Sequence, residues 1–129
     1  MKTLTLFSFL FLLQLFIAFP IQVQAQSNPI ESIKGALKTG NVAELSQFFA
    51  SKIDLILPDE EDRLSKAEAA AKLTTFFAQN RPNGFTQKHE TVAPNGAKCL
   101  IGNLSTSGGS FRTTVLVLNG KIEEIVIER

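Results

Sequence analysis

The spacing of apolar residues predicts a pair of helices near the start of the folded part of the chain. From residue 28 to 39 the apolar positions recur at helical spacing, and Gly40 stands directly after them. Asn28 or Ser27 would cap the start of this helix. Asn41 and Glu44 then form a pattern close to a capping box, which predicts a second helix. Because the link is so short, the two helices should form a helical hairpin. The apolar side chains of the second helix that we expect in the core are Leu45, Phe48 and Phe49.

The apolar period changes to alternation at residues 53–57, which predicts a strand. Arg63 and Leu64 would return beside it as a short partner strand. Four consecutive acidic residues, Asp59 to Asp62, lie between the two. A calcium loop spaces its oxygen ligands at alternating positions around a glycine, and no glycine is present here. We therefore interpret the acidic run as a solvated hairpin tip.

The remaining pattern predicts one more helix and then only strands. Ser65 and Glu68 form a capping box at the start of a broad apolar stripe that ends before Pro82. From residue 85 onward, alternation and turn signals predict a four-stranded antiparallel meander. The predicted turns are Pro94-Asn95-Gly96, Gly108-Gly109 and Asn119-Gly120. This order predicts an α+β fold, with three helices packed on one face of a curved antiparallel sheet.

The predicted turns also indicate which side chains of the meander share a face. One face has an apolar end and a polar end, and we take it as the face that the helices cover, although the sequence leaves the choice of face open. Its apolar residues are Cys99, Ile101, Leu116, Leu118, Ile125 and Ile127. Its polar residues are Gln87, His89, Asn103, Ser105, Arg112 and Thr114. The opposite face has an apolar centre with charges interspersed, which suits a surface that pairs with another copy of the chain. A single β-bulge would exchange the two faces beyond it.

Charge and residue counts exclude several functional classes. Without Lys2 the chain has twelve basic and twelve acidic residues, so nothing in its charge favours a nucleic acid or an acidic membrane as partner. Cys99 is the only cysteine, so an intramolecular disulfide is impossible, and we interpret it as a small buried residue. With a single histidine besides, a zinc-type ligand cluster is absent, and we expect no metal and no cofactor.

Residues 1–25 have the pattern of a secretory signal peptide. One positive charge, Lys2, precedes a long apolar run, and Val23-Gln24-Ala25 suits cleavage after Ala25. The alternative is a retained membrane anchor, because the run approaches spanning length. We expect cleavage, since no cluster of positive charges follows the run. The mature chain, residues 26–129, would then be a single exported domain, periplasmic or extracellular, with no membrane contact.

Arg112 begins a strongly apolar strand, and two interpretations of it are open. It is either an exposed strand-end charge, paired with Glu128 or Glu123, or a guanidinium at the mouth of a cavity that recognises a carboxylate. In the second case the other polar residues of its face would complete the site. The predicted ligand-binding residues are Arg112, Asn103, His89, Gln87 and Ser105.

The order of elements resembles the nuclear transport factor 2-like, or cystatin-like, cone fold. The chain is also similar to one family of secreted bacterial proteins, domain of unknown function 4783. The matching segments are "SIKGALKTGNVAELSQFF", "SKAEAAAKLTTFFAQN", "IGNLSTSGGSFR" and "IEEIVIE". The resemblance implies a cone-shaped domain with a cavity between sheet and helices, often dimeric and usually exported. In the wider superfamily the cavity binds a small apolar molecule or houses an active site.

The residues argue against a typical enzyme of that superfamily. Its isomerases and dehydratases use a pocket Asp or His as base, commonly with a Tyr donor, and this chain has no Tyr. His89 is the one candidate base, and Cys99 on the same predicted face does not oppose it. We therefore expect a non-enzymatic domain that binds a small ligand in its cavity or a protein partner through its sheet. The alternatives are a small cavity enzyme using His89, isomerase- or dehydratase-like, and a purely structural dimeric module.

Overall fold

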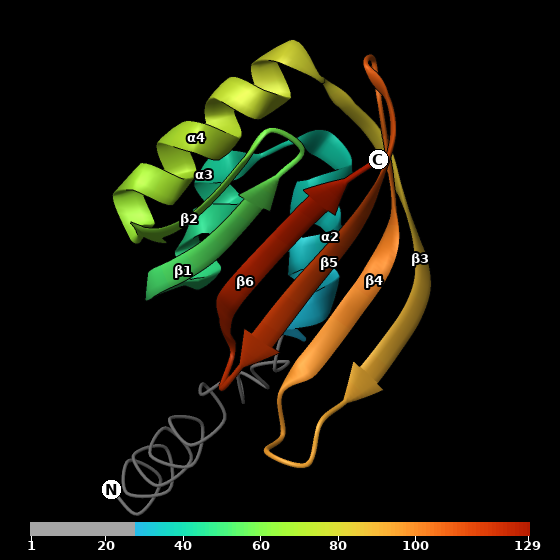
Figure 1. Ribbon diagram of the computed structural model, residues 1–129. Helices are drawn as coiled ribbons and strands as arrows, with labels where there is room; N and C mark the ends of the chain where they lie inside the picture. The colour runs from blue at the N-terminus through green and yellow to red at the C-terminus, as the bar shows by residue number, and fades with distance from the viewer. Residues whose placement is uncertain (1–27) are drawn as a thin grey trace, which may run out of the picture.

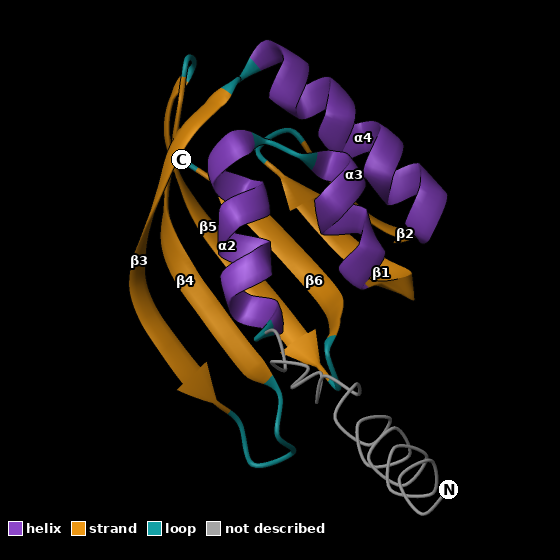
Figure 2. Cartoon of the chain, turned by 180° about the vertical axis from the view of Figure 1, so that it is seen from behind, coloured by secondary structure: helices purple, strands orange, loops and turns teal. Residues whose placement is uncertain are grey.

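The computed structural model describes residues 28–129, so the predicted signal peptide lies outside the described residues. The chain folds as an α+β structure in which a six-stranded sheet carries its helices on one face (Figures 1 and 2). The sheet is strongly curved, and its strand order is β2-β1-β6-β5-β4-β3. Within the described residues, no helix combines the length and the apolar character needed to cross a membrane.

The helices begin and end close to where the sequence predicts them. Helix α2 (Pro29–Thr39) is capped by the Asn28 side chain and ends at Gly40, whose φ of 69° is the left-handed conformation that glycine adopts freely. Helix α4 (Lys66–Gln79) is capped by the Ser65 hydroxyl. The predicted second helix is shorter than expected. It consists of α3 (Val42–Leu45) and one 3-10 turn, η2 (Ser46–Phe48), because Phe49 already pairs with β6.

The strands confirm the predicted hairpin and meander. The first two are β1 (Phe49–Leu57) and β2 (Glu60–Ser65), and the meander consists of β3 (Pro82–Val92), β4 (Lys98–Thr106), β5 (Gly109–Leu118) and β6 (Lys121–Glu128). The turn at Asn119-Gly120 is confirmed, and both residues have the positive φ that such a tight hairpin turn requires. One pairing departs from a fully antiparallel sheet, since β1 runs parallel to β6.

The predicted assignment of faces is wrong, and β-bulges explain part of the error. One irregularity in β6 lies between the pairs Val117–Ile122 and Leu116–Glu124, so Ile122 and Ile125 both face the helices. Another in β3, between Gln87 and His89, puts these two side chains on opposite faces. The turn predicted at Gly108-Gly109 also lies one residue earlier, because Thr106 pairs with Gly109. The helices therefore cover the face that we predicted to be open.

The covered face forms one continuous core with the helices. Buried side chains from β4, β5 and β6 pack against α2 and α4, and the buried hydroxyl of Thr113 lies among them. The sheet residues of this core include Leu100, Leu104, Phe111, Val115, Val117, Ile122, Ile125 and Ile127. With Ile125 and Ile127 moved across by the bulge, this face holds the larger apolar area. Its burial therefore stabilises the fold more than burial of the other face would.

Among the described residues, Thr113 has the one buried polar side-chain atom without a hydrogen-bond partner. Its side chain is fully buried, and its Oγ1 neither donates nor accepts a hydrogen bond there. We expect Thr113→Val to raise the free energy of unfolding by about 1 kcal/mol, because the methyl group avoids the desolvation of an unpaired hydroxyl. Urea denaturation followed by circular dichroism measures the change. Thr113→Ser, which keeps the hydroxyl and loses the methyl group, should be destabilising. A destabilised valine variant would contradict the expectation.

Candidate functional site

The predicted ligand-binding residues do not gather in a cavity under the helices. Arg112, Asn103 and Ser105 project from the uncovered face of the sheet, and all three side chains are exposed. His89 projects from the same face of the edge strand, opposite Ile101, and is also exposed. Gln87 lies on the other face, where it contacts α2. The structure thus keeps four of the five predicted residues on one face, but it is the face that no helix covers.

Arg112 is a strand residue on an open surface. Its neighbours across the sheet are Asn103 on β4 and Glu128 on β6. None of the three ion pairs formed by the described residues includes Arg112, although Glu128 lies opposite it. The interpretation of Arg112 as a charge at the mouth of a cavity covered by helices is therefore wrong. The guanidinium is available to a partner that approaches the open face.

The centre of this open face is apolar. One row of side chains crosses five strands through the register pairs Ile56–Val126, Val126–Thr114, Thr114–Ile101 and Ile101–His89. The next row contains Leu116 and Cys99 and continues through Glu124 on β6 to Asp54 on β1. The apolar members of these rows are half-buried by their sheet neighbours alone, since every helix of residues 28–129 lies on the opposite side (Figure 2). We call this surface the outer sheet face, made of Ile56, Cys99, Ile101, Leu116 and Val126 with its polar margin Arg112, Asn103, Ser105 and His89.

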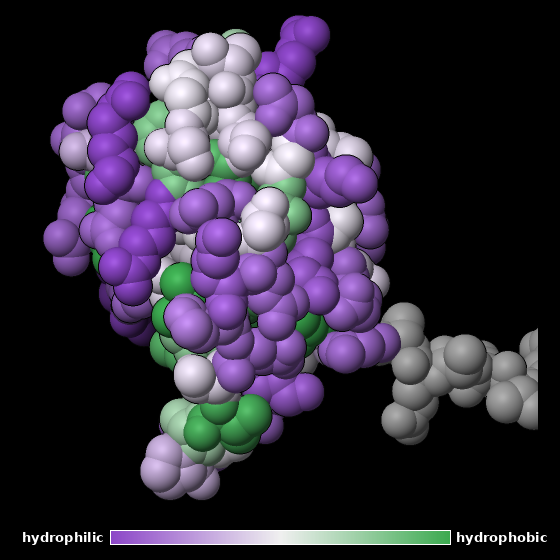
Figure 3. Space-filling model, turned by 90° about the vertical axis from the view of Figure 1, so that its right-hand side faces the viewer, coloured by the Kyte–Doolittle hydropathy of each residue, from purple (hydrophilic) through white to green (hydrophobic). Residues whose placement is uncertain are grey.

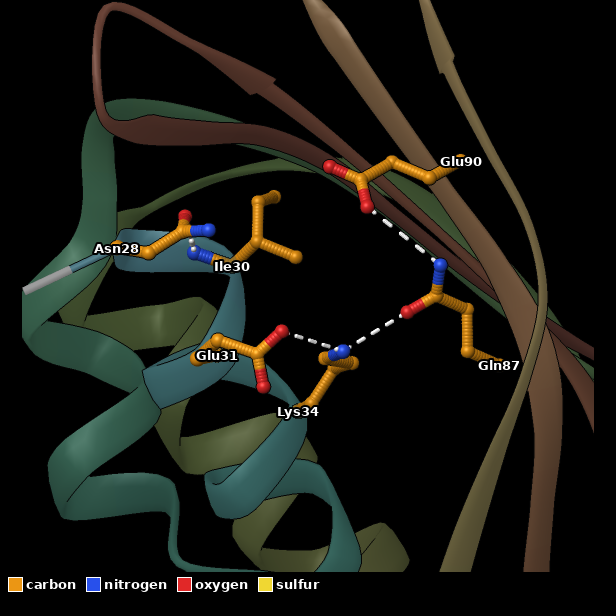
Figure 4. A network of polar contacts seen from close by, with 6 residues as sticks. All are labelled: Asn28, Ile30, Glu31, Lys34, Gln87 and Glu90. Carbon is orange, nitrogen blue, oxygen red and sulfur yellow. Dashed lines mark hydrogen bonds and ion pairs between the residues drawn. The ribbon is translucent and has the colours of Figure 1, made fainter.

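A polar network joins α2 to the edge strand on the other side of the sheet (Figure 4). The Lys34 Nζ lies 2.7 Å from the Glu31 carboxylate and donates to Gln87 Oε1 at 2.8 Å. Gln87 Nε2 in turn donates to Glu90 Oε2 at 3.5 Å. The Glu31 side chain is 67% exposed, so water screens its attraction to Lys34. The network links the edge strand β3 to α2.

Viewed from the β3 edge, the molecule presents mainly hydrophilic side chains, with smaller hydrophobic areas between them and a hydrophobic group at its lower tip (Figure 3). Val92, at the end of β3, is 66% exposed. Charged side chains and the irregularity after Gln87 interrupt this edge, which disfavours pairing with a further strand.

Two cavities of the described residues border α4. One, of about 310 Å³, lies between the β1–β2 turn and α4, and the other, of about 430 Å³, lies between the ends of α2, α3 and α4. Neither is lined by Arg112 or His89. Among the described residues, no group of three or more His, Cys, Asp or Glu is placed to hold a metal ion.

Residues 30–128 match the family Domain of unknown function (DUF4783). The chain belongs to the DUF4783 family. A crystal structure of a DUF4783 family protein from Bacteroides uniformis is similar to it, with 27% identity and a TM-score of 0.73, covering 79% of this chain and 97% of that one. No curated protein was found to match the chain.

More distant solved structures show the fold of this DUF4783 member. An NTF2-like protein of unknown function from Cytophaga hutchinsonii has 13% identity and a TM-score of 0.58, covering 81% of this chain and 92% of that one. An uncharacterised cystatin fold protein from Novosphingobium aromaticivorans has 10% identity and a TM-score of 0.56, covering 78% and 95%. These likenesses confirm the predicted nuclear transport factor 2-like, or cystatin-like, fold. At such identities they show the fold alone.

Sequence reasoning missed both the apolar centre of the outer sheet face and the two cavities beside α4. Ile101 and Leu116 were expected in the core, because their residue types are those of buried strand positions. The cavity at the β1–β2 turn depends on how close that turn comes to α4. The one signal in the sequence was the acidic turn followed by Lys72 on the next helix, which are joined by an ion pair in the structure.

Proposed function

We propose that this DUF4783 member is an exported, non-enzymatic cone-fold domain that acts by contact through its outer sheet face, first of all with a second copy of itself. The observation that carries the proposal is one row across the sheet in which Ile56, Val126 and Ile101 are half-buried and apolar, with no helix of the described residues over them. Apolar patches left uncovered on soluble proteins mark interaction sites. The predicted signal peptide supports export to the periplasm or the extracellular space.

The margin of the outer sheet face suits a second copy of the chain. It carries Arg112 and Glu128 opposite one another, so both signs of charge are present on one patch. A two-fold interface places the same patch on both subunits, which requires such self-complementarity. Interfaces of this type have an apolar centre and a polar margin. The predicted ligand contacts Arg112, Asn103, Ser105 and His89 would then be the margin of a dimer interface.

The enzymatic alternative, a small cavity enzyme using His89, is less well supported by the geometry. His89 is exposed on an open sheet face, and its strand neighbour is Ile101. Proton transfer needs a base held within hydrogen-bond reach of a sheltered substrate. If a turnover is found for this protein, His89→Ala should leave its rate unchanged; a lost rate would restore the alternative.

A substitution that introduces a charge at the centre of the outer sheet face tests the dimer. We expect Ile101→Lys to weaken self-association by roughly 2–4 kcal/mol, because a central interface position would have to bury an unpaired ammonium. Analytical ultracentrifugation over a range of concentrations measures the dissociation constant. Ala71→Lys, an equally charged change on the exposed surface of α4, is the matched control and should leave the constant unchanged.

Two outcomes would overturn the proposal. The unmodified protein would be a monomer at every concentration reached, or Ile101→Lys would associate as tightly as the unmodified chain. Circular dichroism of both variants shows that a loss of association is not a loss of folding.

A further inference from the structure

A groove between the β1–β2 turn and α4 has the composition of a small binding site. It encloses about 310 Å³, which is at the lower end of the range for ligand pockets. One wall is the turn, and the other is a single face of α4, since the helix residues that line it are three or four positions apart. The lining residues are Leu57, Pro58, Asp59 and Glu60 on the turn, and Lys72, Thr75, Phe76 and Gln79 on the helix.

The floor of the groove is apolar and held in place by the core. Leu57 is 8% exposed and belongs to the buried core cluster. The Phe76 ring contacts two further rings, Phe77 at 5.8 Å and Phe111 at 5.4 Å between centroids, the latter edge to face. Because Phe111 is itself buried, its contact fixes the position of the Phe76 ring from the side of the core. An apolar group could therefore lie on Leu57 and Phe76 without any rearrangement of the core.

The charges around the groove favour a cation. Lys72 and Glu60 form an ion pair of 2.6 Å across it, so the one basic residue of the lining is already neutralised. The carboxylate of Glu60, by its hydrogen bond and its charge, raises the pKa of Lys72, and Asp62 and Glu68 add to the increase. The Asp59 side chain is exposed at the edge of the groove and takes part in none of the ion pairs of the described residues. The lining thus has one carboxylate in excess, beside an apolar floor.

We propose that this groove binds a small organic ammonium ion, with its apolar body on Leu57 and Phe76 and its ammonium group against the carboxylate of Asp59. The site is separate from the outer sheet face, which lies on the other side of the sheet, and it does not depend on the function proposed above. Glu60 shares its negative charge with Lys72 and contributes less. An anion of the same size would be repelled by the excess carboxylate.

The probe is 2-phenylethylammonium. It is titrated into the protein expressed from its full coding sequence, and the NMR chemical shifts of the protein report binding. We expect saturable shifts at the turn and the lining face of α4, with a dissociation constant on the order of 1–10 mM for so small a ligand. The neutral isostere 2-phenylethanol should bind roughly fivefold more weakly, and 3-phenylpropanoate should not saturate. Salt at 1 M should reduce the preference for the cation, because it screens the carboxylate.

Two substitutions should change the affinity in opposite directions. Asp59→Asn keeps the shape of the side chain and removes its charge, so ammonium binding should weaken roughly fivefold while alcohol binding is unchanged. Lys72→Gln frees Glu60 from its ion pair, so ammonium binding should strengthen by a few fold. Glu61→Gln is the matched control on the same hairpin, because Glu61 pairs with Ile56 and faces away from the groove. It should have no effect.

Three results would overturn the inference. The first is an absence of saturable shifts at the lining residues. The second is an alcohol that binds as tightly as the ammonium ion. The third is an Asp59→Asn variant with unchanged affinity for the ammonium ion. Dimerisation is measured separately, so failure here leaves the proposed contact surface standing, and failure of dimerisation leaves the groove standing.

Discussion

Phe111→Ala is expected to lower the free energy of unfolding by about 3–5 kcal/mol, the usual cost of removing a buried aromatic ring from a core. Only 1% of the Phe111 surface is exposed. The ring supports Phe76 on α4 edge to face at 5.4 Å, and the Arg129 guanidinium lies over it at 4.9 Å. Its removal would leave a cavity and take away the contact between β5 and α4. Thermal unfolding should shift downward by more than about 10 °C.

The matched control for Phe111 is an apolar side chain that is not packed. Val92→Ala removes methyl groups from a residue that is 66% exposed. Its effect should lie within about 0.5 kcal/mol, as for other surface substitutions. Both variants are compared by urea unfolding at one fixed protein concentration, because association would stabilise the folded state. A change in Phe111→Ala no larger than that in Val92→Ala would mean that β5 is not the centre of the core.

Gly102→Ala is expected to destabilise the protein by about 2–3 kcal/mol through overpacking. A Cβ atom at this position would lie 2.5 Å from the ring carbon Cζ of Phe85 and 2.5 Å from the backbone oxygen of Thr86. The ring could turn aside, but the oxygen belongs to the neighbouring strand β3 and cannot move without disturbing the pairing of β3 with β4. Glycine at residue 102 is therefore required by close approach, and its φ is not in the positive range.

The control for Gly102 is a second glycine, for which the opposite sign is expected. Gly35 lies within α2, and a Cβ there would meet no atom within 4 Å. Gly35→Ala should stabilise the protein by about 0.5–1 kcal/mol, because alanine loses less conformational freedom in a helix. In a Phe85→Ala background, Gly102→Ala should remain destabilising, since the Thr86 oxygen is still in place. If the double variant lost all of the penalty, the ring alone would be responsible.

The sequence predicted local features of the fold well because neighbouring residues determine them. The capping interactions of Asn28 and Ser65 and the left-handed Gly40 depend only on the chain within a few positions. The turn at Asn119-Gly120 requires two residues with positive φ, a conformation that asparagine and glycine adopt most easily. The order of elements and the antiparallel meander follow from such local signals.

Only part of the candidate site could be predicted from the sequence. Side chains alternate between the two faces along a regular strand, but a β-bulge reverses that alternation beyond it. Arg112 and Asn103 share one face, as the turn lengths indicated, but Arg112 lies opposite Asn103 and not opposite Ser105, because the turn begins one residue earlier. Gln87 is not with them, since one irregular position in β3 moves it to the face toward α2. The residue types in β3 and β6 did not indicate the irregularities, because contacts with other strands and helices stabilise a bulge more than its own residue types do.

The sequence by itself therefore determined the helices, the hairpins and the residues that share a strand face over short distances, all of which rest on local conformational preference. Only the tertiary structure decided which face is core. With the β6 irregularity in place, Ile125 and Ile127 join Val115 and Val117, and the face with the larger apolar area is the one that the helices bury. Arg112 is left on the open side by that choice. Burial depends on the summed area of a whole face, and one extra residue in a strand is enough to change that sum.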